Sequence, residues 1–297
     1  MGDSNLIARL FPADGKGYAL GLQAILMSEN KSRYVPPHRE TEPHYGSRES
    51  TASLDEDDEA ASDTSAPGLE LTFNPGPKGR RGLELGTQLD CDIVLPELEK
   101  NNISRVHCAL TFDDQRRLIL RDFSKHGTIV KYDEKGGESR RTIVTKDDKG
   151  REIYHHFKWI LGGHKVPRDT EEIVIEIQGI GFRIDVSTHD ENLHLYNANV
   201  DRFLQQAKAN DELPLGRFSI QSLPSTAAPS GAQTPKQGAI RLKQETLGKG
   251  AFAVVRRFWD VSTGLEYAYK EPLNKRKFRE DLWNREIEIM RQISLVS

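Results

Sequence analysis

The feature that most constrains the fold of this chain is a series of short apolar or alternating runs between Leu69 and Val186. LELTF, HCALTF, RLILRDF and EIVIEI are typical of these runs. Asp, Gly and Lys separate them at roughly the 8–12-residue spacing that is typical of β-sandwiches and barrels. We therefore predict a mainly β fold, with a sandwich over residues 68–187.

The sequence before the sandwich predicts two further segments. Residues 1–30 form a short N-terminal segment, in which YALGLQAILM is a strand or a short helix. Residues 31–67 are rich in Ser, Glu, Asp, Pro and His and contain LDEDDEAASD, with almost nothing to bury. Such a composition predicts a disordered, solvated acidic region. A kinase substrate site at Ser62 or Thr64 is the alternative reading of this region.

After the sandwich, the pattern changes to helix, linker and a second folded part. Residues 188–210 predict a connector helix, and residues 211–238 form a Pro/Ser-rich linker. Residues 239–297 are strand-rich at first and end in the helical FREDLWNREIEIMRQI. The apolar face expected of the connector helix consists of Val200, Phe203, Leu204 and Ala207.

Charge, cysteine content and hydropathy restrict the function classes. The net charge of −3 is not that of a general nucleic-acid binder, so we expect no direct nucleic-acid partner. Cys91 and Cys108 predict free buried thiols in a reducing compartment, since no secretory leader is evident. No apolar run approaches the ~18 residues of a membrane span. We therefore expect no membrane partner and a nuclear or cytoplasmic location. The histidines show no ligand spacing, so we expect no metal site.

A first cluster of chemically useful side chains occurs at the ends of two expected strands. Ser104, Arg105 and His107 precede the run HCALTF, and Ser124–Thr128 (SKHGT) precede another strand. An anion held by loops needs a guanidinium for charge, a hydroxyl for a directed hydrogen bond and a rigid backbone. If both loops lie at the same end of the sandwich, they form a basic, hydroxyl-rich notch.

The blocks LELGTQLDCDIVL, NISRVHCAL and LILRDFSKHGTIV together resemble a forkhead-associated (FHA) domain, a β-sandwich that reads phosphothreonine peptides. The resemblance implies that Ser104 hydrogen-bonds the phosphate and that Arg105 adds charge. It implies phosphothreonine-containing proteins as partners, with self-association through the domain as a further expectation. The other residues to which it gives a role are Lys125 and His126 for peptide binding, and Gly86, His107, Gly127 and Thr128 for loop structure.

Two positions depart from the family pattern. Thr87 stands where the family has a phosphate-contacting arginine, and His126 stands where it has an asparagine that holds the peptide backbone. A lost charge-assisted hydrogen bond to phosphate costs ~1.5–3 kcal/mol. Arg80, Arg81 or Lys125 are the electrostatic substitutes that the sequence offers. The alternative is a sandwich that serves as a scaffold and has no phosphate dependence.

A second cluster begins with LGKGAFAVV, a glycine-rich turn between two strand-like runs. Gly248 and Gly250 let backbone amides approach phosphate oxygens, and Val255 would cover an aromatic base. Lys270 follows in YAYKEP, and Glu286 follows in the last helix, with Met290 and Ile293 on its apolar side.

This order of glycine loop, strand lysine and helix glutamate resembles the N-terminal lobe of a Ser/Thr protein kinase of the calcium/calmodulin-dependent type. The resemblance implies ATP as cofactor, with Lys270 on its phosphates and Glu286 orienting that lysine. Leu247 and Ala268 would line the adenine slot. Glu288 competes with Glu286 for the ion pair, and an unrelated β-α unit is the alternative. The run NKRKFR is either a nuclear signal or the solvated start of the helix.

An FHA domain ahead of a kinase lobe resembles the checkpoint-type Ser/Thr kinases, in which the domain recruits the kinase to its substrates. The chain has no His-Arg-Asp loop and no Asp-Phe-Gly motif, so it contains no catalytic residues of that mechanism. Binding of Mg²⁺ would require the missing C-terminal lobe. We expect the 297 residues to be a fragment that transfers no phosphoryl group by itself. The alternative is a non-catalytic FHA adaptor or scaffold with a vestigial kinase lobe.

Overall fold

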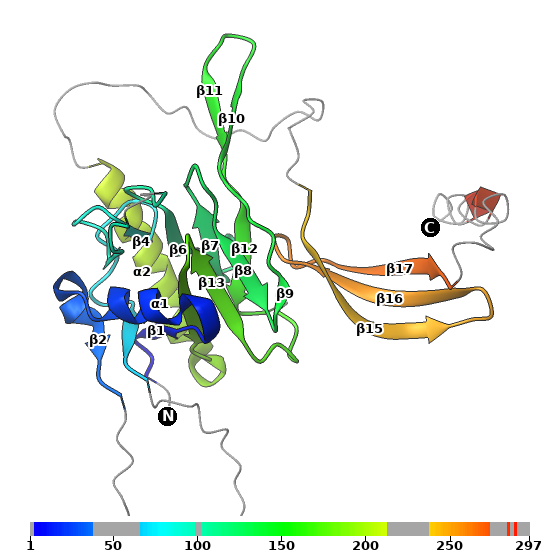
Figure 1. The fold of residues 1–297 in the computed structure, drawn as a ribbon, viewed down its shortest axis with the longest axis horizontal. Helices are drawn as coiled ribbons and strands as arrows, with labels where there is room; N and C mark the ends of the chain where they lie inside the picture. Colours follow the sequence, from blue (N-terminus) through cyan, green and yellow to red (C-terminus); the bar gives the residue numbers. More distant parts are fainter. Residues whose placement is uncertain are drawn as a thin grey trace, which may run out of the picture. The chain divides into compact units, whose positions relative to one another are not determined.

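The computed structural model describes residues 3–37, 66–98, 102–164, 166–212 and 238–273, together with the helical pairs 284–285 and 288–289. These residues fall into two compact units, Met1–Ile240 and Arg241–Ser297 (Figure 1). Both units consist mainly of strands. The prediction of a mainly β chain is confirmed.

The first layer of the sandwich is a seven-stranded sheet in which every pair of neighbours is antiparallel. Its order is β2-β3-β1-β14-β13-β8-β9. The strands are β1 (Leu6–Pro12), β2 (Tyr34–Val35), β3 (Gly68–Thr72), β8 (Ile129–Tyr132), β9 (Lys135–Gly136), β13 (Ile173–Ile177) and β14 (Ile180–Val186).

The second layer is a five-stranded sheet of order β12-β7-β6-β4-β5. Its strands are β4 (Leu83–Gly86), β5 (Ile93–Val94), β6 (Cys108–Phe112), β7 (Leu118–Asp122) and β12 (Lys158–Gly162). Leu10 of β1, Leu120 of β7 and Trp159 of β12 are fully buried members of the core. The hydroxyl of Tyr132 in β8 donates a hydrogen bond to the carbonyl of Ile160 in β12 at 2.7 Å, which joins the two sheets through the core.

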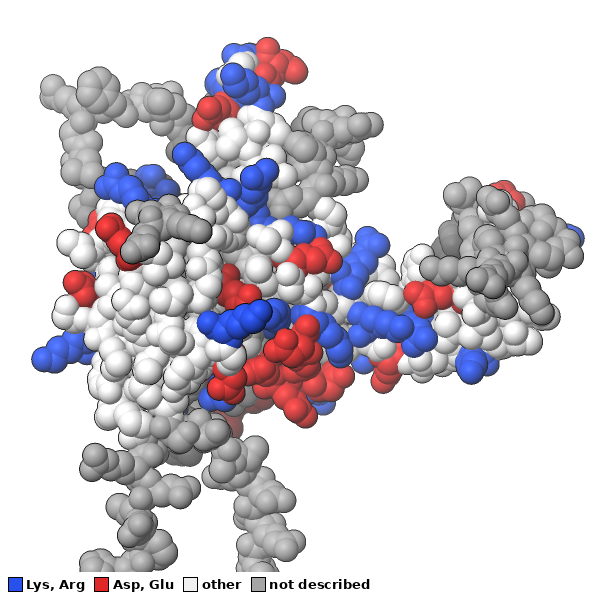
Figure 2. Space-filling model, in the orientation of Figure 1, with Lys and Arg blue, Asp and Glu red and all other residues white. Residues whose placement is uncertain are grey.

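A separate hairpin projects from the sandwich (Figure 1). It consists of β10 (Ile143–Lys146) and β11 (Glu152–His155), paired antiparallel in a sheet of their own. The outer end of the hairpin carries charges of both signs (Figure 2), among them Lys149 and Arg151. The tip projects away from both sheets (Figure 1), so substitutions there can serve as controls.

The N-terminal residues are an integral part of the sandwich and not a separate segment. β1 pairs with β3 on one side and with β14 on the other, so it lies inside the seven-stranded sheet. The short 3-10 helix η1 (Gly15–Gly17) and helix α1 (Tyr18–Ile25) follow, and α1 packs on β1 and β14. Of the two alternatives for YALGLQAILM, the helix is the one that forms.

The prediction of disorder from residue 31 onwards is wrong for residues 31–35. They lie in the 3-10 helix η2 (Ser28–Arg33) and in β2. The side chain of Asn30 exchanges hydrogen bonds with the backbone of Val94 at 2.8 and 2.9 Å, and Arg33 forms a buried ion pair with Asp92 at 2.8 Å. Composition could not reveal these bonds, because their partners lie some sixty positions further along the chain. The rest of the acidic region lies largely outside the described residues.

The C-terminal helix of the first unit docks on the sandwich. The 3-10 helix η3 (Asp190–Asn192) leads into α2 (Leu193–Glu212), which contacts β6. Val200, Phe203 and Ala207 of the predicted apolar face are buried. The rings of Phe203 and Phe112 of β6 pack edge to face, with their centres 5.2 Å apart. Within the described residues, no helix has the length and apolar character of a membrane span.

Both cysteines are free and buried, as predicted. Burial and the neighbouring carboxylates, first among them Glu84, raise the pKa of the Cys91 thiol to about 12. Cys108 is fully enclosed in β6, and its pKa is raised in the same direction. Neither thiol is therefore a nucleophile at neutral pH.

The second unit is a three-stranded antiparallel sheet of order β15-β16-β17. β15 (Arg241–Lys249), β16 (Ala253–Asp260) and β17 (Glu266–Pro272) follow one another along the chain. Trp259 of β16 is fully buried. The glycine-rich stretch of the sequence forms the end of β15 and the turn into β16.

The position of β1 leads to a prediction about truncation. A chain that begins at residue 66 lacks the strand between β3 and β14, and also lacks the Asn30 and Arg33 bonds. We expect residues 66–212 to show no cooperative unfolding transition in urea followed by circular dichroism, whereas residues 1–212 unfold cooperatively. A cooperative transition of the shorter chain would mean that β1 is dispensable.

Candidate functional site

The candidate site in the first unit begins where the end of β4 meets the loop before β6. The amide of Thr87 donates to the carbonyl of Ser104 at 3.4 Å, and the amide of Gln88 donates to the carbonyl of Arg105 at 3.1 Å. The two segments approach so closely that a Cβ atom at position 86 would collide with the Arg105 carbonyl oxygen. Gly86 is therefore the residue that allows Thr87 to lie beside Ser104 and Arg105.

His107 joins this loop to the loop that follows β7. The amide of Ser104 donates to His107 Nδ1 at 3.1 Å, and His107 Nε2 lies 3.2 Å from the carbonyl oxygen of Gly127. A backbone amide only donates and a carbonyl only accepts, so Nδ1 is the acceptor and Nε2 carries the proton. The imidazole is thus neutral. Its burial lowers the pKa of His107 to about 4.

The loop after β7 is shaped by a buried carboxylate. Asp122 accepts hydrogen bonds from the hydroxyl of Ser124 at 2.8 Å and from the hydroxyl of Thr128 at 2.6 Å. The Ser124 hydroxyl in turn accepts the Gly127 amide at 2.7 Å. Burial raises the pKa of the Asp122 carboxyl, and the bonds from Thr128 and Ser124 oppose that rise. Gly127 has φ +93°, a left-handed conformation that favours glycine.

These bonds place the predicted peptide-contacting residues on two loops that are fixed to each other. Ser104 is half-buried and Arg105 is exposed on the first loop, while Lys125 and His126 are exposed on the second. Ser104 and Gly127 contact opposite nitrogens of one imidazole ring, so the loops lie at the same end of the sandwich. The exposed groups present a hydroxyl, a guanidinium, an ammonium and an imidazole to solvent, a set that suits an anion.

One residue of the site was not found by sequence reasoning. Gln178, at the β13–β14 turn, donates from Nε2 to the carbonyls of His126 and Gly127 at 3.4 and 3.2 Å. It holds the second loop from the side of the other sheet. The hairpin turn itself is visible in the sequence, but no local pattern indicates that a side chain from it reaches residues about fifty positions earlier.

Arg80 and Arg81, the two possible substitutes for the arginine missing at Thr87, lie elsewhere. They line a hollow whose other lining residues include neither Ser104 nor Arg105. Of Arg80, Arg81 and Lys125, the structure places only Lys125 on one of the two loops, the loop that follows β7.

In the second unit, the strand register places the predicted nucleotide-contacting residues in a row. Val255 of β16 lies opposite Gly248 of β15 and opposite Lys270 of β17. Because side chains alternate along strands, Ala268 shares the face of Lys270. Leu247 is half exposed near the end of β15, and Gly250 closes the turn through a hydrogen bond from its amide to Ala253.

Glu286, the expected partner of Lys270, lies outside the described residues. Its competitor Glu288 is described as part of a short helical piece and is exposed. In the part of the chain that the structure describes, no three His, Cys, Asp or Glu side chains are grouped so that they could hold a metal ion.

Comparison with known proteins identifies the domain that carries the loops. The family model described as FHA domain matches residues 79–147, which run from just before β4 to the end of β10. No curated protein matches the chain. Among solved structures, Rad53 1-466 in complex with AMP-PNP matches with 14% sequence identity and a TM-score of 0.32. That match covers 98% of this chain and 51% of that chain, so the present chain spans about half of its length.

The neutral state of His107 leads to a prediction about pH. Its pKa is about 4 in the folded protein against an ordinary value of 6.5, so the unfolded chain binds more protons between these limits. The part of the free energy of unfolding that depends on neutral His107 has its full value above pH 6.5. It is lost as the pH falls towards 4, by about 3 kcal/mol in total. Urea unfolding over this range should show a loss that is larger by about 3 kcal/mol in the wild type than in His107→Gln, because His156 and His189, whose pKa values are also lowered by burial, contribute equally to both. Parallel pH profiles of the two proteins would contradict a neutral, buried His107.

Proposed function

We propose that the first unit binds phosphothreonine-containing peptides through the loop pair 104–107 and 124–128, together with residues 86–88 at the end of β4. The FHA domain supports this, since FHA domains bind phosphothreonine-containing proteins. The observation that carries the proposal is His107, which bonds the backbone of Ser104 on one side and that of Gly127 on the other. A rigid backbone under exposed donors is what an anion-binding loop requires.

In this proposal each loop residue has a separate task. The Ser104 hydroxyl donates to a phosphate oxygen, and Arg105 adds a charge-assisted bond. Lys125 and His126 face the peptide from the second loop, which Gln178 and Asp122 hold in shape. Thr87 lies beside Ser104, where it provides a hydroxyl but no charge. We therefore expect weaker phosphate binding than an arginine at that position would give.

The first test removes the hydroxyl and the guanidinium together. In fluorescence-polarisation binding to a degenerate phosphothreonine peptide library, Ser104→Ala with Arg105→Ala should weaken binding about ten- to a hundredfold. The preference for phosphothreonine over phosphoserine should be lost as well. Lys149→Ala with Arg151→Ala, at the tip of the β10–β11 hairpin, removes two cations elsewhere and should leave binding unchanged. A scaffold without phosphate dependence would bind phosphorylated and unphosphorylated libraries equally.

The second test restores the missing charge. Thr87→Arg should strengthen phosphothreonine-peptide binding about tenfold, because a charge-assisted bond replaces a neutral one next to Ser104. Gln88→Arg introduces the same charge one residue further along and serves as the control. An equal gain in peptide affinity in both variants would indicate general electrostatic attraction. It would mean that position 87 does not contact the phosphate.

We further propose that the second unit binds an adenine nucleotide as part of a protein kinase, to which the first unit brings phosphothreonine-bearing partners. The register supports this, since Gly248, Val255 and Lys270 lie in one row across the sheet. Val255 and Ala268 would contact the base, while Lys270 would contact the phosphates. Phosphoryl transfer is not proposed for these 297 residues by themselves, because they hold no catalytic aspartate of that mechanism.

Nucleotide binding can be tested on the chain itself. Lys270→Met should weaken binding of ATP, measured by equilibrium dialysis, by about tenfold, since a charge-assisted bond to phosphate is lost. Lys243→Met, on the exposed side of β15, removes the same charge and should have no effect. If neither variant changes ATP binding, or if the wild type binds none, the proposal for the second unit fails while that for the FHA domain stands.

A further inference from the structure

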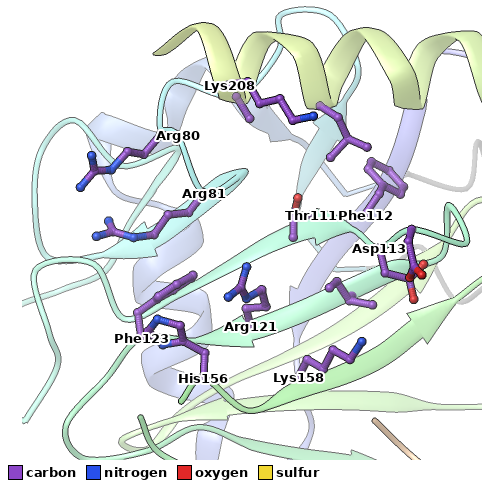
Figure 3. A pocket seen from close by; sticks show the side chains of 14 residues that line it. Arg80, Arg81, Thr111, Phe112, Asp113, Arg121, Phe123, His156, Lys158 and Lys208 are labelled. Carbon is purple, nitrogen blue, oxygen red and sulfur yellow. The ribbon is translucent and has the colours of Figure 1, made fainter. Parts of the chain in front are cut away.

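The outer side of the five-stranded sheet contains a hollow of about 680 Å³ that is separate from the loop pair. It lies between the sheet and α2 (Figure 3). Thr111 of β6, Arg121 of β7 and Leu204 of α2 are among its lining residues. Its basic lining consists of Arg80, Arg81, Arg121, His156, Lys158 and Lys208.

The positive charge at one end of the hollow is poorly neutralised. Among the described residues, the carboxylate that forms an ion pair with Arg81 is that of Glu84, at 3.5 Å, which is long for an ion pair. No carboxylate among the described residues forms an ion pair with Arg121, whose contact is with the ring of Phe123. Desolvation lowers the pKa of Arg121, and the charge of Arg81 lowers it further. The two guanidiniums therefore lie close enough to repel each other.

Phe123 holds these two side chains in place. The guanidinium carbons of Arg81 and Arg121 lie 5.0 and 5.5 Å from the centre of its ring. The ring of His156 packs against Phe123 at 4.5 Å, and its Nδ1 lies 2.9 Å from the Thr142 hydroxyl. Cation–π contact fixes a guanidinium without using its N–H groups, which remain available to an acceptor. Both guanidiniums are thus held at one ring with N–H groups left for an acceptor.

We propose that this hollow is a second phosphate-binding site, which takes a phosphorylated side chain of a peptide on Arg81 and Arg121. A phosphate dianion offers three acceptor oxygens and relieves the repulsion between the two guanidiniums. Lys208 of α2 faces the same space from above (Figure 3) and adds charge at the opening. The site does not depend on Ser104 or Arg105, so it stands apart from the function proposed for the loops.

The composition of the hollow favours a peptide over a nucleic acid. Its other end is lined by Asp113 and Asp114, and Figure 3 shows Asp113 across the hollow from Arg80 and Arg81. Asp113 is bound to Arg117 at 2.6 Å, and Asp114 is exposed. A run of backbone phosphates would meet the exposed carboxylate of Asp114 with like charge. A peptide with one phosphate and a basic residue further along would match both ends.

Apolar side chains between the charged ends support the same occupant. Phe112, Ile119, Leu204 and Ala207 are among the lining residues of the hollow. Phe112, Ile119 and Ala207 are buried and form the floor of the hollow, whereas Leu204 is partly exposed and can contact a residue that flanks a phosphorylated side chain. A volume of about 680 Å³ lies within the ~300–1,000 Å³ that is usual for ligand pockets, which is enough for a few residues of a peptide.

The test uses the 297-residue chain and degenerate peptide libraries with a central phosphoserine, phosphothreonine or unphosphorylated residue. Binding is measured by fluorescence polarisation in the background of Ser104→Ala with Arg105→Ala, in which the loop site is disabled. We expect residual binding that requires the phosphate but does not distinguish phosphothreonine from phosphoserine. Adding Arg81→Ala with Arg121→Ala should reduce that residual binding by about tenfold or more. Adding Lys149→Ala with Arg151→Ala instead, at the same change in charge, should leave it intact.

Three results would overturn the proposal. The first is the absence of phosphate-dependent binding once the loop site is disabled, which leaves the loop proposal untouched. The second is residual binding that the hairpin control reduces as strongly as the arginine pair does. The third is tighter, Arg81- and Arg121-dependent binding of a single-stranded oligonucleotide, which would assign the hollow to nucleic acid. Circular dichroism of each variant distinguishes a loss of binding from a loss of fold.

Discussion

The loop end of the sandwich depends on one neutral imidazole. His107 immediately precedes β6. Its ring accepts a hydrogen bond from the amide of Ser104 in one loop and donates a hydrogen bond to the carbonyl of Gly127 in the other. A protonated ring would present a second N–H to the amide of Ser104, so the hydrogen bond that orients the ring within the first loop would become a repulsion. Burial secures the neutral form over the ordinary pH range, since it lowers the pKa of this residue to about 4. The exposed donors on both loops keep their relative positions for this reason.

The sequence predicts those parts of the molecule that local pattern determines. Alternating runs indicate the strands, the spacing of Val200, Phe203 and Ala207 indicates the docked face of α2, and the order of the loop motifs indicates the FHA domain. What it misses depends on distant pairs. The side chain of Asn30 donates a hydrogen bond to the backbone of Val94, and that of Gln178 donates one to the backbone of Gly127. Neither composition nor periodicity predicts such contacts between distant residues. The basic hollow is missed for the same reason, since β7, the segment before β4 and α2 each contribute only one or two cations to it.

The two surfaces of the FHA domain differ in what fixes their donors. At the loops, backbone hydrogen bonds through His107, Ser124 and Asp122 determine where side chains emerge. On the outer face of the five-stranded sheet, an aromatic ring holds the arginines directly. The first arrangement fixes the backbone from which Ser104, Arg105, Lys125 and His126 emerge, as the proposed recognition of one phosphorylated residue requires. The second fixes the long side chains themselves and tolerates variation in what approaches them.

The place of β1 in the seven-stranded sheet bears on how the domain forms during synthesis. β1 ends at Pro12, and its partner β14 begins at Ile180, about 170 residues later. At a translation rate of ~5–20 residues per second, β1 is made on the order of ten to thirty seconds before β14 exists. Throughout that interval its largely apolar surface has no complete sheet to join. Until then β1 can pair only with β3, and the edge that later receives β14 stays open.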